Sequence, residues 1–306
     1  MGGVFLFLKN KEETLIKREE YLTKKGESHI KTRGNRFKKE REKKNLSLSE
    51  HMRYFLQLSY DGTAYHGWQI QPNADTVQAR FNAALSTLLR HDVSTTGAGR
   101  TDTGVHARMM VAHFDTERVF DCKDLCFRLS RLLPPDIAVQ QIVPVSEHAH
   151  ARFDATRRAY HYDIICGKDP FHRFFTTNIH YQLDFNRMNE AALLLHGKHD
   201  FTSFSKTGSD TKTNFCTINE AQWLQLGENH WRFRISADRF LRGMVRAIVG
   251  TLFNVGNGKF SPEELNTILH QANRRAAGES APAKGLSLVE VSYPDNIFKP
   301  CPVFYQ

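Results

Sequence analysis

The chain has 306 residues, a formal net charge of +9 and five cysteines. This length allows two packed domains or one large domain. No apolar run approaches the roughly 18 to 20 residues that span a bilayer, so the sequence predicts no transmembrane helix and no membrane partner. The cysteines are odd in number and scattered without C-x-x-C spacing, which argues against a disulfide framework or a zinc site and favours a reducing cytoplasm.

The first 51 residues carry most of the net positive charge, with 14 Lys and Arg against 8 Asp and Glu. The remainder of the chain keeps a net charge of only +3, so binding to an anionic partner such as nucleic acid must depend on local patches. Residues 9–50 contain few large apolar side chains and cannot bury enough surface to offset their ordering entropy. We therefore expect a disordered or loosely helical extension, with a basic arm for nucleic acid as the functional alternative.

Three regular elements are predicted in the first part of the chain after this extension. Residues 53–60 alternate and are rich in aromatic side chains, which predicts a half-buried strand. Thr76 is a suitable N-cap for an amphipathic helix that runs to Arg90. Residues 109–114 are nearly all apolar and predict a buried strand.

A glycine-rich stretch, residues 97–107, separates that helix from that strand. Three glycines in eleven residues predict a tight loop that presents the side chains of Arg100, Asp102 and His106. Neighbouring Thr hydroxyls and Arg100 favour an ionised Asp102, which could act as a nucleophile or a base. The alternative is a structural turn capped by Asp102. The spacing matches neither common phosphate-binding glycine motif.

A second informative stretch, residues 151–164, follows a predicted helix over 121–133 and a predicted strand over 137–143. Its arginines surround the start of an aromatic strand, and this combination offers phosphate contacts and a stacking surface. An ordinary strand edge with solvated charges is the alternative.

The rest of the chain alternates helices and strands. Phe204 is either a core residue or a residue that contacts a base. The apolar period predicts a helix over 239–252, in which Arg242 and Arg246 are four residues apart and share one face. Such arginines need an anionic partner, either Asp102 or a phosphate, unless they form an ion pair elsewhere on the surface. The other predicted elements are a helix over 186–196, a hairpin of strands 217–226 and 231–237, a helix over 261–273 and a closing strand that ends at Val291.

The stretch 97–107 is similar to the central motif G-x-G-R-T-D-x-G-V-H-A of the TruA-type tRNA pseudouridine synthases. Other motifs of that family follow in the expected order around it. They are Y-D-G-T-x-Y-x-G-W-Q from Tyr60, A-R-x-x-A-x-x-R-x-Y-x-Y from Ala151 and F-L-x-x-M-V-R-x-I-V-G from Phe240. The resemblance covers residues 53–292, so chance similarity does not explain it.

The resemblance implies an α+β pseudouridine synthase fold, with two sheet-and-helix halves around a central catalytic cleft. The order of predicted strands and helices agrees with this fold class. We expect residues 52–150 to carry the catalytic loop and residues 151–306 to complete the active site. The resemblance also implies a homodimer that grips tRNA between its subunits.

The implied reaction is the isomerisation of uridine to pseudouridine at positions 38, 39 and 40 in the anticodon stem-loop of tRNAs. The resemblance assigns catalysis to Asp102. It assigns active-site support to Tyr160, which would stack on the base or act in proton transfer, and to Arg246, which would pair with Asp102. RNA binding or base flipping would fall to Arg100, Arg152, Arg158 and Arg242. No cofactor or metal is expected, because the bond broken and the bond formed belong to one nucleotide.

Two other functions compete with this one. An RNA-binding module would keep the fold and lose the catalysis. A hydrolase would use Asp102 together with His106 or His113 as an acid-base pair. Since the resemblance begins only after Met52, the first 51 residues are also open to interpretation as a gene-model artefact.

Overall fold

The computed structural model describes residues 52–206, 208 and 212–299. The predicted extension over residues 1–51 lies outside the described residues, so its disorder stays a prediction. The described strands are β1 (Met52–Tyr60), β2 (Thr96–Gly97), β3 (His106–Thr116), β4 (Ile137–Pro144), β5 (Arg157–Cys166), β6 (Thr177–Ile179), β7 (Gly197–Asp200), β8 (Phe215–Gln225), β9 (His230–Ala237) and β10 (Leu286–Ser292). They form one mixed sheet in the order β4-β1-β3-β10-β5-β9-β8-β7, with β2 paired to β3 and β6 paired to β5.

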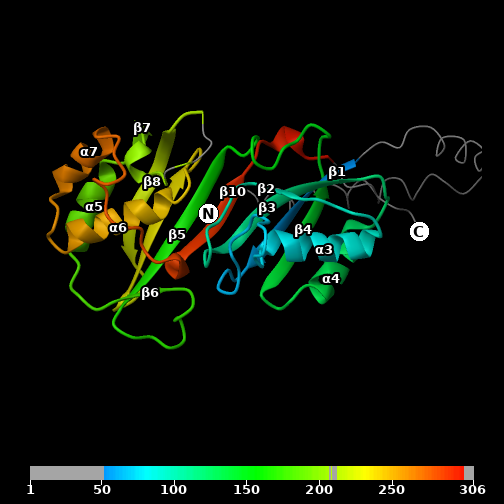
Figure 1. Cartoon of the computed structure of the whole chain (residues 1–306), viewed down its shortest axis with the longest axis horizontal. Coiled ribbons are helices and arrows are strands. Elements are labelled where there is room, and N and C mark those ends of the chain that lie inside the picture. The colour runs from blue at the N-terminus through cyan, green and yellow to red at the C-terminus, as the bar shows by residue number, and fades with distance from the viewer. Residues whose placement is uncertain (1–51, 207, 209–211, 300–306) are drawn as a thin grey trace, which may run out of the picture. The chain divides into compact units, whose positions relative to one another are not determined.

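Two groups of helices pack on the two ends of this sheet (Figure 1). The helices are α3 (Val77–Leu89), α4 (Cys122–Leu132), α5 (Phe185–Leu193), α6 (Met244–Gly256) and α7 (Pro262–His270). The first two share a core with β1, β3 and β4, in which Phe81 and Leu129 are fully buried. The other three form a second core with β8 and β9, around Phe233 and Ile248. The fold is therefore α+β, with two sheet-and-helix parts.

Local sequence signals account for most of these elements. The side chain of Thr76 accepts a hydrogen bond from the N–H of Ala79 and caps α3 as predicted. Ser261 and Glu264 form a reciprocal capping box at the start of α7, with Pro262 in the first turn. The predicted hairpin is confirmed by β8 and β9, whose residues pair in antiparallel register. The strands and helices predicted before residue 150 are also confirmed, with shifts of a few residues at their ends.

The predicted helix over residues 239–252 starts too early. In the structure α6 begins at Met244, after Gly243 with a φ of +70°. This left-handed residue separates Arg242 from the helix, so Arg242 and Arg246 do not share one helix face. Arg242 is exposed and needs no buried anionic partner. The apolar period continued across Gly243 because Phe240 packs against the second core outside any helix.

Two further boundaries differ from the predictions. Helix α5 ends at Leu193, although Leu195 beyond it is buried. The strand predicted from Met109 begins at His106, which removes His106 from the loop and places it in the sheet. Phe204 is completely buried in a short 3₁₀ helix (Thr202–Phe204), so it is a core residue and not one that contacts a base.

Strand β10 joins the two parts of the sheet. It pairs in parallel with β3 and antiparallel with β5, and Figure 1 shows it in red between these strands. Its Leu288 belongs to the first core and its Leu286 to the second. The two parts therefore meet along β3, β10 and β5. Among the described residues, no helix has the length and apolar character needed to cross a bilayer.

His113 gives the fold a predicted sensitivity to acid. Its ring is 7% exposed, and its Nδ1 accepts the N–H of Ala151 (3.1 Å). Burial, together with the charges of Arg53 and His150, lowers the pKa of His113 to about 4. An unfolded histidine titrates near pH 6.5, so unfolding takes up a proton between these values. The stabilisation of the folded state by the neutral His113 is thus complete above pH 6.5 and is lost as the pH falls towards 4.

We expect wild-type stability to fall by about 2 kcal/mol from pH 7.5 to pH 5 through this histidine alone. Urea unfolding at both pH values checks this. In His113→Gln, which keeps an acceptor and does not titrate, the pH dependence should shrink by that amount. Equal pH dependence in both proteins would show that His113 does not cause it.

Candidate active site

Asp102 lies on the loop over residues 98–105, which connects β2 to β3 and is called the catalytic loop below. The N–H of Val105 donates to the carbonyl of Asp102 (3.1 Å), and Gly104 has a φ of +75°. The chain therefore turns directly after Asp102. The carboxylate of Asp102 is 29% exposed, so a substrate can reach it. Placement on a loop between strands of one sheet gives such a group a rigid mounting.

The segment over residues 60–69, which comprises the end of β1 and the loop after it, is called the cradle below and packs directly against the catalytic loop. A Cβ at Gly62 would lie 2.0 Å from the carbonyl oxygen of Val105, and a Cβ at Gly67 would lie 2.2 Å from that of Thr101. No side chain fits at these distances, so both positions require glycine. The glycines of the cradle thus allow two backbones to touch and fix the catalytic loop from one side.

Tyr60 adds a buried hydrogen bond to this contact. Its hydroxyl lies 2.8 Å from Oγ1 of Thr101. Burial raises the pKa of Tyr60 far above its usual value, so the hydroxyl stays neutral. The hydroxyl of Thr101 is therefore engaged with the cradle, whereas the sequence suggested that it supports Asp102.

Arg246 reaches Asp102 from the first turn of α6. Its Nη1 lies 3.3 Å from Oδ2 of Asp102, and its Nε donates to the carbonyl of Ala281 (2.7 Å). Both side chains of the ion pair are only partly exposed, at 23% for Arg246 and 29% for Asp102. The second hydrogen bond fixes the plane of the guanidinium, so the arginine orients the carboxylate and also neutralises its charge.

Tyr160 lies on β5, where its strand neighbours are Leu288 of β10 and Ile235 of β9. Its ring meets the ring of Phe240 edge to face, with 5.3 Å between centroids. Burial raises the pKa of Tyr160 to about 12, and the nearby charge of Asp102 adds to this shift. Tyr160 is therefore a neutral phenol at physiological pH. The structure thus brings Asp102, Tyr160 and Arg246 together from three separate segments.

The four other predicted arginines fall into two classes. Arg100, Arg152 and Arg242 are exposed. Arg152 lies over the ring of Phe153, 5.7 Å from its centroid, which gives a cationic and aromatic surface. Arg158 differs from these, because its terminal nitrogens donate to four backbone carbonyls within the protein.

His106 is a structural residue that the sequence misplaced on the exposed loop. Its ring is 2% exposed. Nε2 lies 3.1 Å from the carbonyl of Lys284, and Nδ1 lies 3.1 Å from the N–H of Gly62 and 3.0 Å from the carboxylate of Asp61. Both ring nitrogens are thus occupied within the protein. His106 and Ala107 are both buried, so no alternation at the start of β3 marked His106 as a strand residue.

His113 is not available as a partner of Asp102 either. It lies seven residues beyond His106 along β3, or roughly 23 Å at the rise of an extended strand. Its ring is buried against Phe55, and its Nδ1 is occupied by the N–H of Ala151. These two histidines therefore do not form the acid-base pair with Asp102 that a hydrolase would need.

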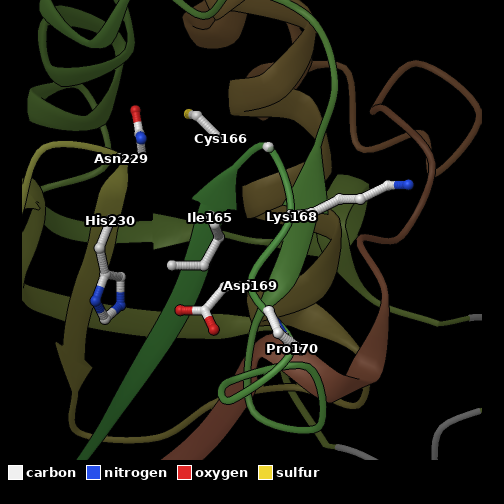
Figure 2. Close-up of a pocket in the computed structure, with 8 residues that line it drawn as sticks. Ile165, Cys166, Lys168, Asp169, Pro170, Asn229 and His230 are labelled. Carbon is white, nitrogen blue, oxygen red and sulfur yellow. The ribbon is translucent and has the colours of Figure 1, made fainter.

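A surface pocket of about 440 Å³ lies outside this site (Figure 2). It is formed at the end of β5, where Ile165 lies five residues from Tyr160, or roughly 16 Å along the strand. Its other labelled lining residues are Cys166, Lys168, Asp169, Pro170, Asn229 and His230. Within the described part of the chain, no group of His, Cys, Asp and Glu side chains is placed to hold a metal ion.

Comparisons with known proteins identify the family of this chain. A family model described as tRNA pseudouridine synthase matches residues 58–154 and 191–294, which include Asp102 and Arg246. A tRNA pseudouridine synthase A of Bacteroides fragilis is 55% identical over 248 residues, covering 81% of this chain and 98% of that protein. The tRNA pseudouridine synthase A of Porphyromonas gingivalis is 51% identical, covering 80% of this chain and 99% of its own. The chain therefore belongs to the tRNA pseudouridine synthase family.

Proposed function

We propose that this protein isomerises uridine to pseudouridine at positions 38, 39 and 40 in the anticodon stem-loop of tRNAs, with Asp102 as the catalytic residue. Membership of the family makes the chain an isomerase that acts on tRNA uridines. The observation that carries the finer proposal is the partly exposed carboxylate of Asp102, ion-paired to Arg246 beside the phenol of Tyr160. The specific positions follow from the likeness of residues 97–107 to the TruA-type motif.

The reaction needs a flipped base and one reactive carboxylate. The target uridine leaves its stack so that its glycosidic bond reaches Asp102. Asp102 assists cleavage of the bond between C1′ and N1, either by covalent attack or by taking a ribose proton. The uracil then rotates and its C5 bonds to C1′, while C5 loses its proton and N1 gains one. Substrate and product have the same composition, so no co-substrate is required.

The surrounding residues have distinct roles in this proposal. Arg246 holds the carboxylate of Asp102 in place. Tyr160 offers a neutral ring and hydroxyl for stacking on the uracil or for proton transfer. Arg100 is exposed on the same loop as Asp102 and is suited to fill the space left by the flipped base or to bind its phosphate.

Three broader features belong to the same proposal. Residues 52–150 carry the catalytic loop, and residues 151–306 supply Tyr160 and Arg246. The enzyme acts as a homodimer on tRNA in the cytoplasm. Family resemblance supports the dimer, and sedimentation of the full chain with and without tRNA tests it.

The test of the reaction is release of tritium from tRNA labelled at C5 of uracil. Wild-type protein should release one tritium for each pseudouridine formed. Comparison of tRNAs that carry uridine at only one of positions 38, 39 and 40 then shows which position reacts. Appearance of free uracil would instead identify a hydrolase. Stable tRNA binding without release of either product would support the binding module.

Arg246→Lys provides a test of carboxylate orientation. Lysine keeps the positive charge but cannot contact both Asp102 and the Ala281 carbonyl through a planar group. We expect the single-turnover rate to fall roughly 10- to 100-fold while tRNA affinity stays within a few-fold. Arg128→Lys, an exposed change on α4, serves as the matched control and should retain the wild-type rate. A wild-type rate in Arg246→Lys would show that orientation by this arginine is unimportant.

A further inference from the structure

Both terminal nitrogens of Arg158 donate to backbone carbonyls. Nη1 donates to Ala155 (2.8 Å) and Asp238 (2.9 Å), and Nη2 donates to Ala98 (3.1 Å) and Arg152 (2.5 Å). An arginine has five N–H groups, and four of them are used here. Burial lowers the pKa of Arg158, but a guanidinium keeps its charge in proteins, so the carbonyl dipoles must compensate for lost hydration.

Two of these carbonyls, those of Ala98 and Asp238, belong to opposite sides of the proposed active site. Ala98 is the first residue of the catalytic loop, four residues before Asp102, and it is 2% exposed. Its own N–H is bonded to the carbonyl of Val111 on β3 (2.7 Å). Arg158 therefore supplies the second of two hydrogen bonds that fix the backbone at the base of the catalytic loop.

The other side of the site is reached through Asp238. This residue directly follows β9 and leads to Phe240, whose ring packs on Tyr160. Arg158 lies on β5 two residues before Tyr160, so both side chains are on the same face of the sheet. The guanidinium thus ties the loop that carries Asp102 to the segment that packs on Tyr160.

A contact with an RNA phosphate would conflict with this geometry. To present its fork to a phosphate, Arg158 would have to leave four carbonyls, of which that of Ala98 belongs to a buried residue. Unpaired buried carbonyls are costly. Arg152, by contrast, is exposed. Within the described residues, its side chain has no hydrogen bond that would have to break for it to turn to a phosphate.

We propose that Arg158 is a positioning residue, which sets the catalytic loop against Tyr160 and makes no phosphate contact. This inference rests on the proposed function for its effect on rate. It departs from the RNA-binding role that the family motif suggests for this arginine. Its prediction is a loss of rate without a loss of electrostatic binding to tRNA.

The experiment compares Arg158→Lys and Arg158→Met with Arg152→Met in the full-length chain. Dissociation constants for tRNA are measured at several salt concentrations, and single-turnover tritium release is measured with saturating enzyme. A lost phosphate contact reduces the slope of log affinity against log salt by about 1. We expect this reduction for Arg152→Met only. For Arg158→Met we expect an unchanged slope and a rate that is lower by roughly 100-fold.

The rate constant and the amplitude of the single turnover distinguish a positioning role of Arg158 from a mere loss of protein stability. A variant that is only less stable contains fewer active molecules. With enzyme in excess over tRNA, its rate constant stays that of wild type, and the amplitude falls only when the active molecules become fewer than the tRNA molecules. Positioning predicts a lower rate constant at full amplitude, with partial recovery in Arg158→Lys, which keeps the charge and some donors. If Arg158→Met does not fold, Arg158→Lys alone decides, since it must still be slower than wild type.

Three results would overturn the inference: a salt slope reduced in Arg158→Met, a wild-type rate constant, or a loss confined to amplitude. Failure of the proposed function looks different. In that case wild-type protein releases no tritium from any tRNA. The salt slopes would still decide whether Arg158 contacts RNA.

Discussion

Asp102→Asn should abolish tritium release from tRNA, with a fall of at least roughly 10³-fold in the single-turnover rate. Asparagine has nearly the same shape as aspartate, so the catalytic loop should keep its structure. Its amide can neither attack C1′ nor take a ribose proton. Binding should stay within a few-fold of wild type, because the loss of a negative charge next to Arg246 does not weaken attraction to a polyanion.

The control for this variant is Asp124→Asn, which removes the same charge at an exposed ion pair on α4. It should keep the wild-type rate and affinity. Normal turnover by Asp102→Asn would show that Asp102 is not the catalytic residue. A loss of tRNA binding together with turnover would instead give Asp102 a role in assembling the site.

Gly67→Ala should have the second-largest effect, although it adds only one methyl group. The new Cβ would lie 2.2 Å from the carbonyl oxygen of Thr101, and the backbone has a φ of +85°. The cradle and the catalytic loop must then separate, which moves Asp102 relative to Arg246. We expect a loss of about 2 to 4 kcal/mol in the free energy of unfolding and a fall of roughly 100-fold in rate.

Gly99→Ala is the matched control for stability. It lies in the catalytic loop itself, but a Cβ there has no heavy atom within 4 Å, and its φ lies outside the left-handed region. Alanine should leave the midpoint of urea unfolding unchanged or raise it slightly, because it restricts the unfolded chain. Equal midpoints in both variants would mean that the close approach at Gly67 is not needed for stability.

Periodicity and capping chemistry were sufficient to predict most regular elements. Thr76 and the pair Ser261 and Glu264 are local signals, and the structure uses them as the sequence suggested. The start of α6 was missed for a physical reason. Apolar residues continue at helical spacing through Gly243, but the backbone there is left-handed. The spacing of apolar residues gives no information on this backbone conformation.

The candidate site was predictable at the level of single residues and not at the level of their contacts. A carboxylate flanked by glycines marked Asp102, and a family motif marked Tyr160 and Arg246. Some partners of His106 and Arg158 are backbone groups far away in the sequence, such as the carbonyls of Lys284 and Asp238. Every residue has such a carbonyl, so side-chain identity gives no signal for these bonds.

The central place of β10 also has no local signal. Its parallel pairing with β3 joins residues about 180 positions apart, and only tertiary packing decides this. The turn before it provides the carbonyls of Ala281 and Lys284, which hold Arg246 and His106.

This late strand has a consequence for biosynthesis. A nascent chain that has emerged only to residue 280 lacks β10, so the partner edges of β3 and β5 are left without their central neighbour. Open strand edges invite wrong pairing, and contacts between distant residues form slowly. The same nascent chain lacks the carbonyl that orients the guanidinium next to Asp102. We therefore expect catalytic competence to appear only when translation is almost finished, and ribosome-bound chains stalled before residue 281 to be inactive.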